Sequence, residues 1–254
     1  MGDAGGRSAA HGAQPAAATG SRSARDRCSA MLRSRSRDSA AGGCHGQTKA
    51  GEIGLDLVTF FLRQHAAVHA SDVSGHVFPS PRIFGALSDD QMRMRPGPGL
   101  NSPIWLLWHM ARTEDAAVNP VVAGRDQILD DEWVRRMNVP WPIIGTGMTD
   151  GEVAEMTARA DIASVRAYRS AVGLRTREVV RALRPEEWDE IIGAEDIKRG
   201  ALAGAFRDWV EGTQYPWLGW TRGDQLASSA LRHNAAHIGE AVTVLGLAGV
   251  ALGI

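Results

Sequence analysis

Cysteine is scarce in this chain and absent from the part that the sequence predicts to fold. The two cysteines, Cys28 and Cys44, both lie within the first 50 of the 254 residues. The rest of the chain therefore cannot form a disulfide, a cysteine–zinc site or a cysteine nucleophile. This absence fits a reducing, cytoplasmic setting, which is the localisation we expect.

Net charge and long apolar runs are lacking as well. The formal charge is −1 at pH 7, which argues against nucleic acid or an anionic membrane surface as a main partner. No apolar run reaches the ~18–20 residues that are needed to span a bilayer. The sequence therefore predicts no nucleic-acid partner and no membrane partner.

The first 50 residues lack every large β-branched or aromatic residue that could build a core. They contain no Val, Ile, Phe, Tyr or Trp, and eight Lys or Arg residues against three acids give them a charge of +5. Such a segment cannot bury enough apolar surface to offset its chain entropy, so we predict a disordered tail over 1–50 and a folded domain over 51–254. A transit peptide, a nucleic-acid-binding tail and a true start at Met31 remain alternatives for this segment.

Apolar residues recur every three or four positions in four segments of the remaining chain, which predicts four main helices. Asn101-Ser102-Pro103 is typical of a helix start, because a capping polar residue precedes proline. Thr149-Asp150-Gly151-Glu152 reads as a capping box, and Asp224 is expected to cap the last helix. The helices are expected at about residues 52–72, 102–119, 150–183 and 225–247.

No convincing strand pattern accompanies these helices, so the expected fold class is all-α. Four helices joined by long connections are typical of a four-helix bundle. The connection over 185–222 is rich in tryptophan, which we expect to pack it onto the bundle rather than to stack on ligands. These tryptophans are Trp188, Trp209, Trp217 and Trp220.

Two histidines, His233 and His237, are four residues apart in the predicted last helix. Residues at this spacing lie one above the other on a helix surface, so the two imidazoles could chelate one divalent metal. Eight histidines placed at random would give roughly a quarter of one such pair, yet the chain has a second, His65 and His69. A pair alone is therefore weak evidence, and each histidine could be an ordinary surface residue bonded to water or a neighbour.

His109 strengthens the case because it lies in the middle of an apolar helix. An imidazole without a partner there would cost several kcal/mol. Convergence with His233 and His237 on a metal would satisfy all three, and three histidines with open positions are typical of catalytic zinc or nickel sites. Glu240, one turn past His237, could orient a ligand, bind the metal or face solvent, and we favour an orienting or surface role.

The two blocks Asn101-Ser-Pro-Ile-Trp-Leu-Leu-Trp-His109-Met-Ala-Arg-Thr-Glu114-Asp115 and Arg232-His233-Asn-Ala-Ala-His237-Ile-Gly-Glu240 together resemble the DinB-like superfamily, in its branch of actinobacterial type. The resemblance covers about residues 52–254. It implies a four-helix bundle with a long crossover and a divalent metal, zinc or nickel, held by a histidine of the second helix and a histidine pair of the fourth. These positions correspond to His109, His233 and His237.

The resemblance also implies an activity. The superfamily includes enzymes that use mycothiol or bacillithiol as a low-molecular-weight thiol cosubstrate, for S-transfer to an electrophilic substrate or for isomerisation. The metal would hold the sulfur as a thiolate. No catalytic residue is assigned, and Arg112 is expected to form a surface ion pair. A homodimer is expected by analogy only. A metal-binding bundle without catalysis, or a purely structural bundle, remains the alternative.

Overall fold

The structure is a computed structural model that describes residues 56–76, 79–202, 204–207 and 217–252. The tail predicted to be disordered, residues 1–50, lies outside these ranges, as does Trp209. Within them the regular elements are helices, and a single isolated bridge joins Ile191 to Thr221. The prediction of an all-α fold is confirmed.

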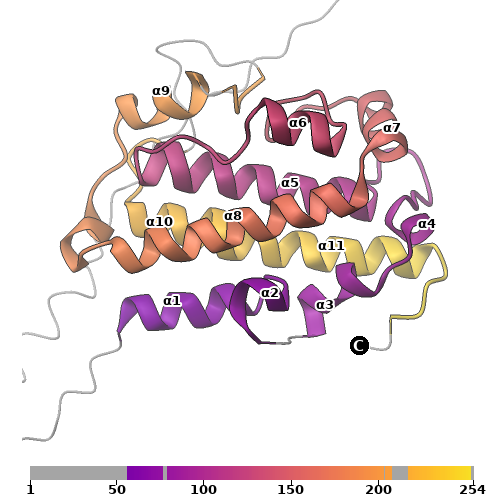
Figure 1. Cartoon of the computed structure of the whole chain (residues 1–254), viewed down its shortest axis with the longest axis horizontal. Coiled ribbons are helices and arrows are strands. Elements are labelled where there is room, and N and C mark those ends of the chain that lie inside the picture. Colours follow the sequence, from indigo (N-terminus) through magenta and orange to yellow (C-terminus); the bar gives the residue numbers. More distant parts are fainter. Residues whose placement is uncertain (1–55, 77–78, 203, 208–216, 253–254) are drawn as a thin grey trace, which may run out of the picture. The chain divides into compact units, whose positions relative to one another are not determined.

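Four segments correspond to the predicted bundle helices (Figure 1). They are α1 (Leu57–Ala66), α5 (Pro103–Ala116), α8 (Ile162–Ala182) and α11 (His233–Leu247). Helix α5 packs against both α8 and α11, and α1 packs against α8. Every residue of α5 is buried, as the apolar sequence of its first half predicts.

Shorter helices and turns connect these four. They are α2 (Ser71–Ser74), α3 (Pro79–Ala86), α4 (Asp89–Met92), the π-helical η2 (Ala117–Val122), α6 (Asp131–Met137), α7 (Asp150–Arg159), the 3-10 helix η3 (Pro185–Asp189), α9 (Ala194–Leu202), α10 (Arg222–Leu226) and the π-helical η4 (Ala227–Arg232). None of the described helices is both long and apolar enough to cross a membrane.

The capping signals set most helix starts. Ser102 accepts a hydrogen bond from the Trp105 backbone N–H at the start of α5, and Pro103 follows as the first helical residue. Thr149 and Glu152 form the predicted capping box of α7. These local contacts explain why the sequence predicts the starts of α5 and α7 correctly.

The helix predicted over 150–183 is in fact two helices. Ala160 has an extended backbone, and Asp161 caps a new helix by accepting from the Ser164 backbone N–H. The break carries neither glycine nor proline, so periodicity alone did not reveal it. The first helix is also shorter than expected, because α1 ends at Ala66 and α2 is separate.

The last helix begins earlier than predicted. Thr221, not Asp224, is its capping residue, and Asp224 completes the capping box from the third helical position. The helix then widens into the π-helical η4 before it continues as α11. Such π-turns interrupt the α-helical register and are frequent at functional sites.

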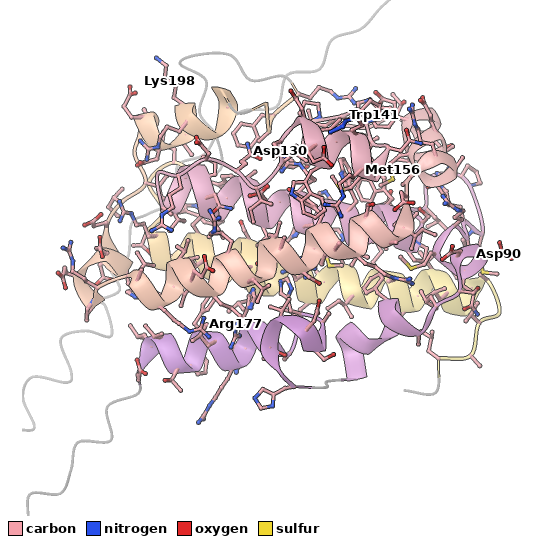
Figure 2. The ribbon with its side chains drawn as sticks, viewed as in Figure 1. Asp90, Asp130, Trp141, Met156, Arg177 and Lys198 are labelled. Atoms are coloured by element: carbon pink, nitrogen blue, oxygen red, sulfur yellow. The ribbon has the colours of Figure 1, made fainter. Side chains whose placement is uncertain are left out.

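The polar end of α5 is buried rather than exposed. Arg112 forms a buried ion pair with Asp115 at 3.2 Å, which corrects the prediction of a surface pair. Tyr168 donates to the same Asp115 carboxylate at 2.5 Å. Arg177 of α8 lies toward α1 (Figure 2), and it donates to the Leu62 carbonyl of that helix at 2.9 Å. Polar contacts as well as apolar packing therefore fix α8 in the bundle.

The connection between α8 and α10 packs onto the helices as predicted. Trp188 contacts the cluster formed by α1, α8 and α10, and Trp217 packs against Phe206. Both indoles are buried. They therefore act as apolar anchors of this connection.

Candidate metal site

Three histidine rings converge between α5 and α11. Nε2 of His233 lies 3.0 Å from Nε2 of His109 and 3.2 Å from Nε2 of His237. Two nitrogen ligands about 2.1 Å from a zinc ion, at bond angles of about 90–110°, are separated by about 3.0–3.4 Å. The structure thus brings together the three residues that the sequence singled out, at the separations that ligands of one ion have.

Neighbouring acceptors decide where two of these rings carry their protons. Nδ1 of His109 lies at hydrogen-bond distance from the Ile144 carbonyl, which can only accept. Nδ1 of His237 lies 2.7 Å from the Glu240 carboxylate. Each ring therefore carries its proton on Nδ1 and directs an Nε2 lone pair at His233. A neutral His233 can donate at most one proton from its Nε2, so it cannot form a hydrogen bond with both lone pairs. A cation would bind all three nitrogens.

Burial keeps these rings uncharged. It lowers the pKa of His109 to about 4, and it lowers the pKa of His233, with help from the neighbouring His109 and His237, to about 3. Both imidazoles are neutral at pH 7, which is the form that binds metals. The site is therefore ready to accept a divalent ion without first losing protons from these two rings.

The surroundings hold the ligand rings in place. Trp105 stacks on His109 with ring centroids 4.6 Å apart, and its indole N–H points to the Met148 sulfur at 3.4 Å. Asn101, just before α5, donates to Glu240 at 2.9 Å. The carboxylate that fixes His237 is thus itself fixed, as the outer partners of metal-bound histidines commonly are. These contacts place Glu240 where it could orient His237, which is one of the two roles expected from the sequence.

Comparison with known proteins places this arrangement in a family. The sequence model of the DinB superfamily matches residues 81–241, a range that contains all three histidines. The chain belongs to the DinB superfamily. The match is made at the level of the superfamily, so the actinobacterial branch stays a prediction. No curated protein matches the chain.

A solved structure has a similar overall fold. It is the crystal structure of a conserved protein of a locus from Enterococcus faecalis, with a TM-score of 0.56 at 18% identity. The alignment covers 76% of this chain and 97% of that chain. At this identity the likeness concerns the fold alone.

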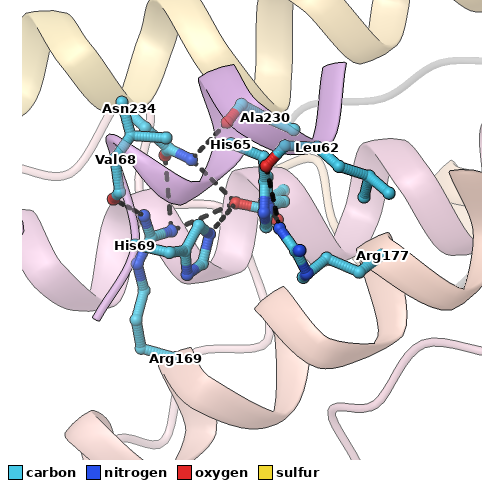
Figure 3. Close-up of polar contacts among 9 residues, drawn as sticks. Leu62, His65, Val68, His69, Arg169, Arg177, Ala230 and Asn234 are labelled. Atoms are coloured by element: carbon cyan, nitrogen blue, oxygen red, sulfur yellow. Dashed lines mark hydrogen bonds and ion pairs between the residues drawn. The ribbon is translucent and has the colours of Figure 1, made fainter. Parts of the chain in front are cut away.

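A second cluster of histidines lies deeper in this DinB bundle (Figure 3). Nε2 of His65 lies 3.0 Å from one Glu114 oxygen, and Nε2 of His69 lies 2.9 Å from the other. Arg169 and Asn234 donate to the same carboxylate at 3.2 and 2.7 Å. All five residues are buried, and His65 and His69 precede the residues that the family model matches.

In the second cluster, unlike the first, the Nε2 atom of each histidine faces a carboxylate oxygen that can accept its proton. Burial alone would raise the pKa of Glu114, but His69 and His65 hold it well below its usual value, so it is an ionised acceptor for both rings. A divalent ion would instead require the Nε2 lone pairs and shift each ring proton to Nδ1. The Arg169 cation, which pairs with the Glu114 carboxylate at 3.2 Å, would also repel the ion. We therefore interpret this cluster as a hydrogen-bonded network.

Sequence reasoning noticed the His65/His69 pair but found no partner for it. Glu114 is that partner, and its burial was not expected. The sequence does hold one sign of it, because Glu114 is an acid in the same helix as His109, five residues further on. Asn234 and the Ile144 carbonyl were also missed, because only the folded chain brings them to these side chains.

Proposed function

We propose that this DinB protein binds one divalent ion, zinc or nickel, through Nε2 of His109, His233 and His237. The observation that carries the proposal is that the three Nε2 atoms lie close together although the rings of His109 and His237 carry their protons on Nδ1. The donor set fits the ion, since neutral imidazoles suit zinc and nickel. Three protein ligands leave positions open for a further molecule, as in catalytic sites.

We propose further that the protein is a thiol-dependent S-transferase or isomerase. A metal ion at this site would lower the pKa of a bound low-molecular-weight thiol, of the mycothiol or bacillithiol type, and hold it as a thiolate. The chain's two cysteines, Cys28 and Cys44, both lie outside the described fold. The proposal therefore takes the nucleophile from a cosubstrate.

The chain's own residues would position and shield the reacting groups. Glu240 and the Ile144 carbonyl keep protons on the outer nitrogens of His237 and His109, so the inner nitrogens stay available. Trp105 covers one face of His109 and excludes water from it. His233 and His237 are half-buried, so a cosubstrate would approach from the side of α11.

Metal analysis tests the first part of the proposal. We expect purified protein to contain a single zinc or nickel ion per chain, and we expect a chelator to lower its Tm. His109→Ala and His237→Ala should lose the ion. His76→Ala, which replaces an exposed histidine outside both clusters, is the matched control and should retain it. The proposed site would be refuted if wild-type protein carries no stoichiometric metal and its Tm does not change in chelator.

A thiol-consumption assay tests the second part. Mycothiol and bacillithiol are each offered with a panel of electrophiles, and consumption should depend on both the metal and His237. Consumption that continues unchanged in His237→Ala would contradict a catalytic role. A protein that binds metal but consumes neither thiol would instead be the non-catalytic metal-binding bundle.

A further inference from the structure

Asn234 links the two histidine clusters, because it follows the ligand His233 in α11 and belongs to the network around Glu114. Its side-chain N–H₂ donates to Glu114 at 2.7 Å and to the Ala230 carbonyl at 2.9 Å. Its side-chain oxygen accepts from Arg169 at 3.3 Å. A fully buried amide with this many partners has no freedom to turn.

Two of the three partners of Asn234 come from the helical segments that the metal site joins. Glu114 is on α5, which also carries His109, and Ala230 is in η4, directly before α11. The amide therefore ties the start of α11 to α5 and also bonds a carbonyl of the π-helical turn. Figure 3 shows Asn234 joined to Arg169 of α8 and grouped with His65 and His69 around one carboxylate.

Small rotations of α11 would open the three-histidine site. A side-chain atom about 5–6 Å from a helix axis moves by about 2 Å when the helix turns by about 20°. That displacement is as long as a metal–nitrogen bond. His233 and His109 can bind the same ion only if contacts between the helices keep the rotation of α11 relative to α5 well within about 20°.

We propose that Asn234 is a positioning residue of the metal site: through Glu114 it fixes the rotation of α11 that brings His233 to His109. The network around Glu114 is rigid because four side chains donate to one carboxylate and Arg169 balances its charge at 3.2 Å. Asn234 transmits this rigidity to the adjacent ligand. The inference rests on the proposed function, since it assigns a determinant of metal affinity.

The test compares Asn234→Ala with Gln225→Ala. Gln225 is an equally buried amide in the same helical segment, but its side chain donates only within that segment, to Ser229 at 2.8 Å. Zinc affinity is measured by competition with a chromogenic chelator, and the visible spectrum of the Co²⁺-substituted protein reports ligand geometry. Tm in excess chelator reports the stability of the metal-free fold.

We expect Asn234→Ala to bind zinc about 10–100-fold more weakly and to change the Co²⁺ spectrum, as the loss of an outer partner does. Gln225→Ala should lower the metal-free Tm without either effect. Unchanged affinity in Asn234→Ala, or an equal loss in Gln225→Ala at equal Tm, would overturn the positioning role. A wild-type protein that binds no zinc, nickel or Co²⁺ would instead refute the proposed function, so the two failures are distinguishable.

Discussion

Gly145 packs so closely on His109 that a Cβ atom in its place would lie 3.1 Å from Nδ1 of the ring. The same atom would come within 2.8 Å of Trp108, and the Gly145 backbone has a φ of +99°, which L-residues rarely adopt. The adjacent Ile144 supplies the carbonyl that fixes the His109 proton. The loop therefore needs glycine here to approach His109 this closely.

Gly145→Ala should weaken metal binding as well as the fold. Backbone strain costs about 1–3 kcal/mol at a positive φ, and relief of the clash would pull Ile144 away from His109. Gly147→Ala is the control, because its φ is +79° but its nearest neighbour, Arg207, is 4.0 Å away. We expect both variants to lose thermal stability and only Gly145→Ala to lose zinc affinity, by about tenfold or more. Equal affinities would show that the loop does not support the ligand.

Glu240→Ala should reduce zinc affinity about 10–100-fold, because Nδ1 of His237 loses the carboxylate that holds its proton and orients its ring. Glu240→Gln should lose less, since an amide oxygen still accepts the hydrogen bond. The control is Glu155→Gln, which breaks an exposed pair with Arg159 far from the site. Chelator competition measures all three, and wild-type affinity in Glu240→Ala would show that the contact is incidental.

Two glycines on different helices should respond oppositely to alanine. Gly173 of α8 faces the second cluster, and a Cβ there would lie 2.5 Å from Nδ1 of His69. Gly239 of α11 is exposed and has nothing within 4 Å of such an atom. Gly173→Ala should destabilise by about 1–3 kcal/mol through overpacking, whereas Gly239→Ala should stabilise by up to about 1 kcal/mol through helix propensity. The free energy of unfolding of both variants is measured with denaturant in the presence of chelator. An unchanged value for Gly173→Ala would mean that His69 can move to make room for the added Cβ.

Acid should destabilise the metal-free fold below about pH 6.5, the ordinary histidine pKa. Burial lowers the pKa values of His69 and His233 to about 3 and that of His109 to about 4. Between these values and 6.5 the unfolded chain binds more protons than the folded one, so stability is full above pH 6.5 and falls as pH decreases. Glu114, whose pKa is also lowered, adds a further loss below about pH 4.5.

Unfolding free energies measured in chelator across pH 4–7 test this dependence. Each proton taken up on unfolding adds a slope of about 1.4 kcal/mol per pH unit. His233→Ala should show a slope shallower by about one proton. A wild-type stability that is flat between pH 7 and pH 5 would mean that these histidines are not buried as neutral groups.

Much of the fold followed from local sequence signals. The apolar periodicity predicted the four main helices, and Ser102 and Thr149 cap their helices where expected. The break at Ala160 and the π-helical η4 were not predicted, because neither contains a glycine or proline that would mark it. The ion pair of Arg112 with a nearby acid was expected and forms with Asp115, but its burial was not, because Tyr168 of α8 reaches it only in the folded chain.

By itself the sequence determined that His233 and His237 share a helix face, because their spacing of four matches the helical repeat. It also placed His109 on an apolar helix. Only the tertiary structure decided that Nε2 of His109 meets His233 across 124 residues of chain. It alone decided that Glu114 is buried and that the Ile144 carbonyl fixes a ring proton. Such contacts depend on how helices rotate against each other, and buried polar partners from distant segments set that rotation.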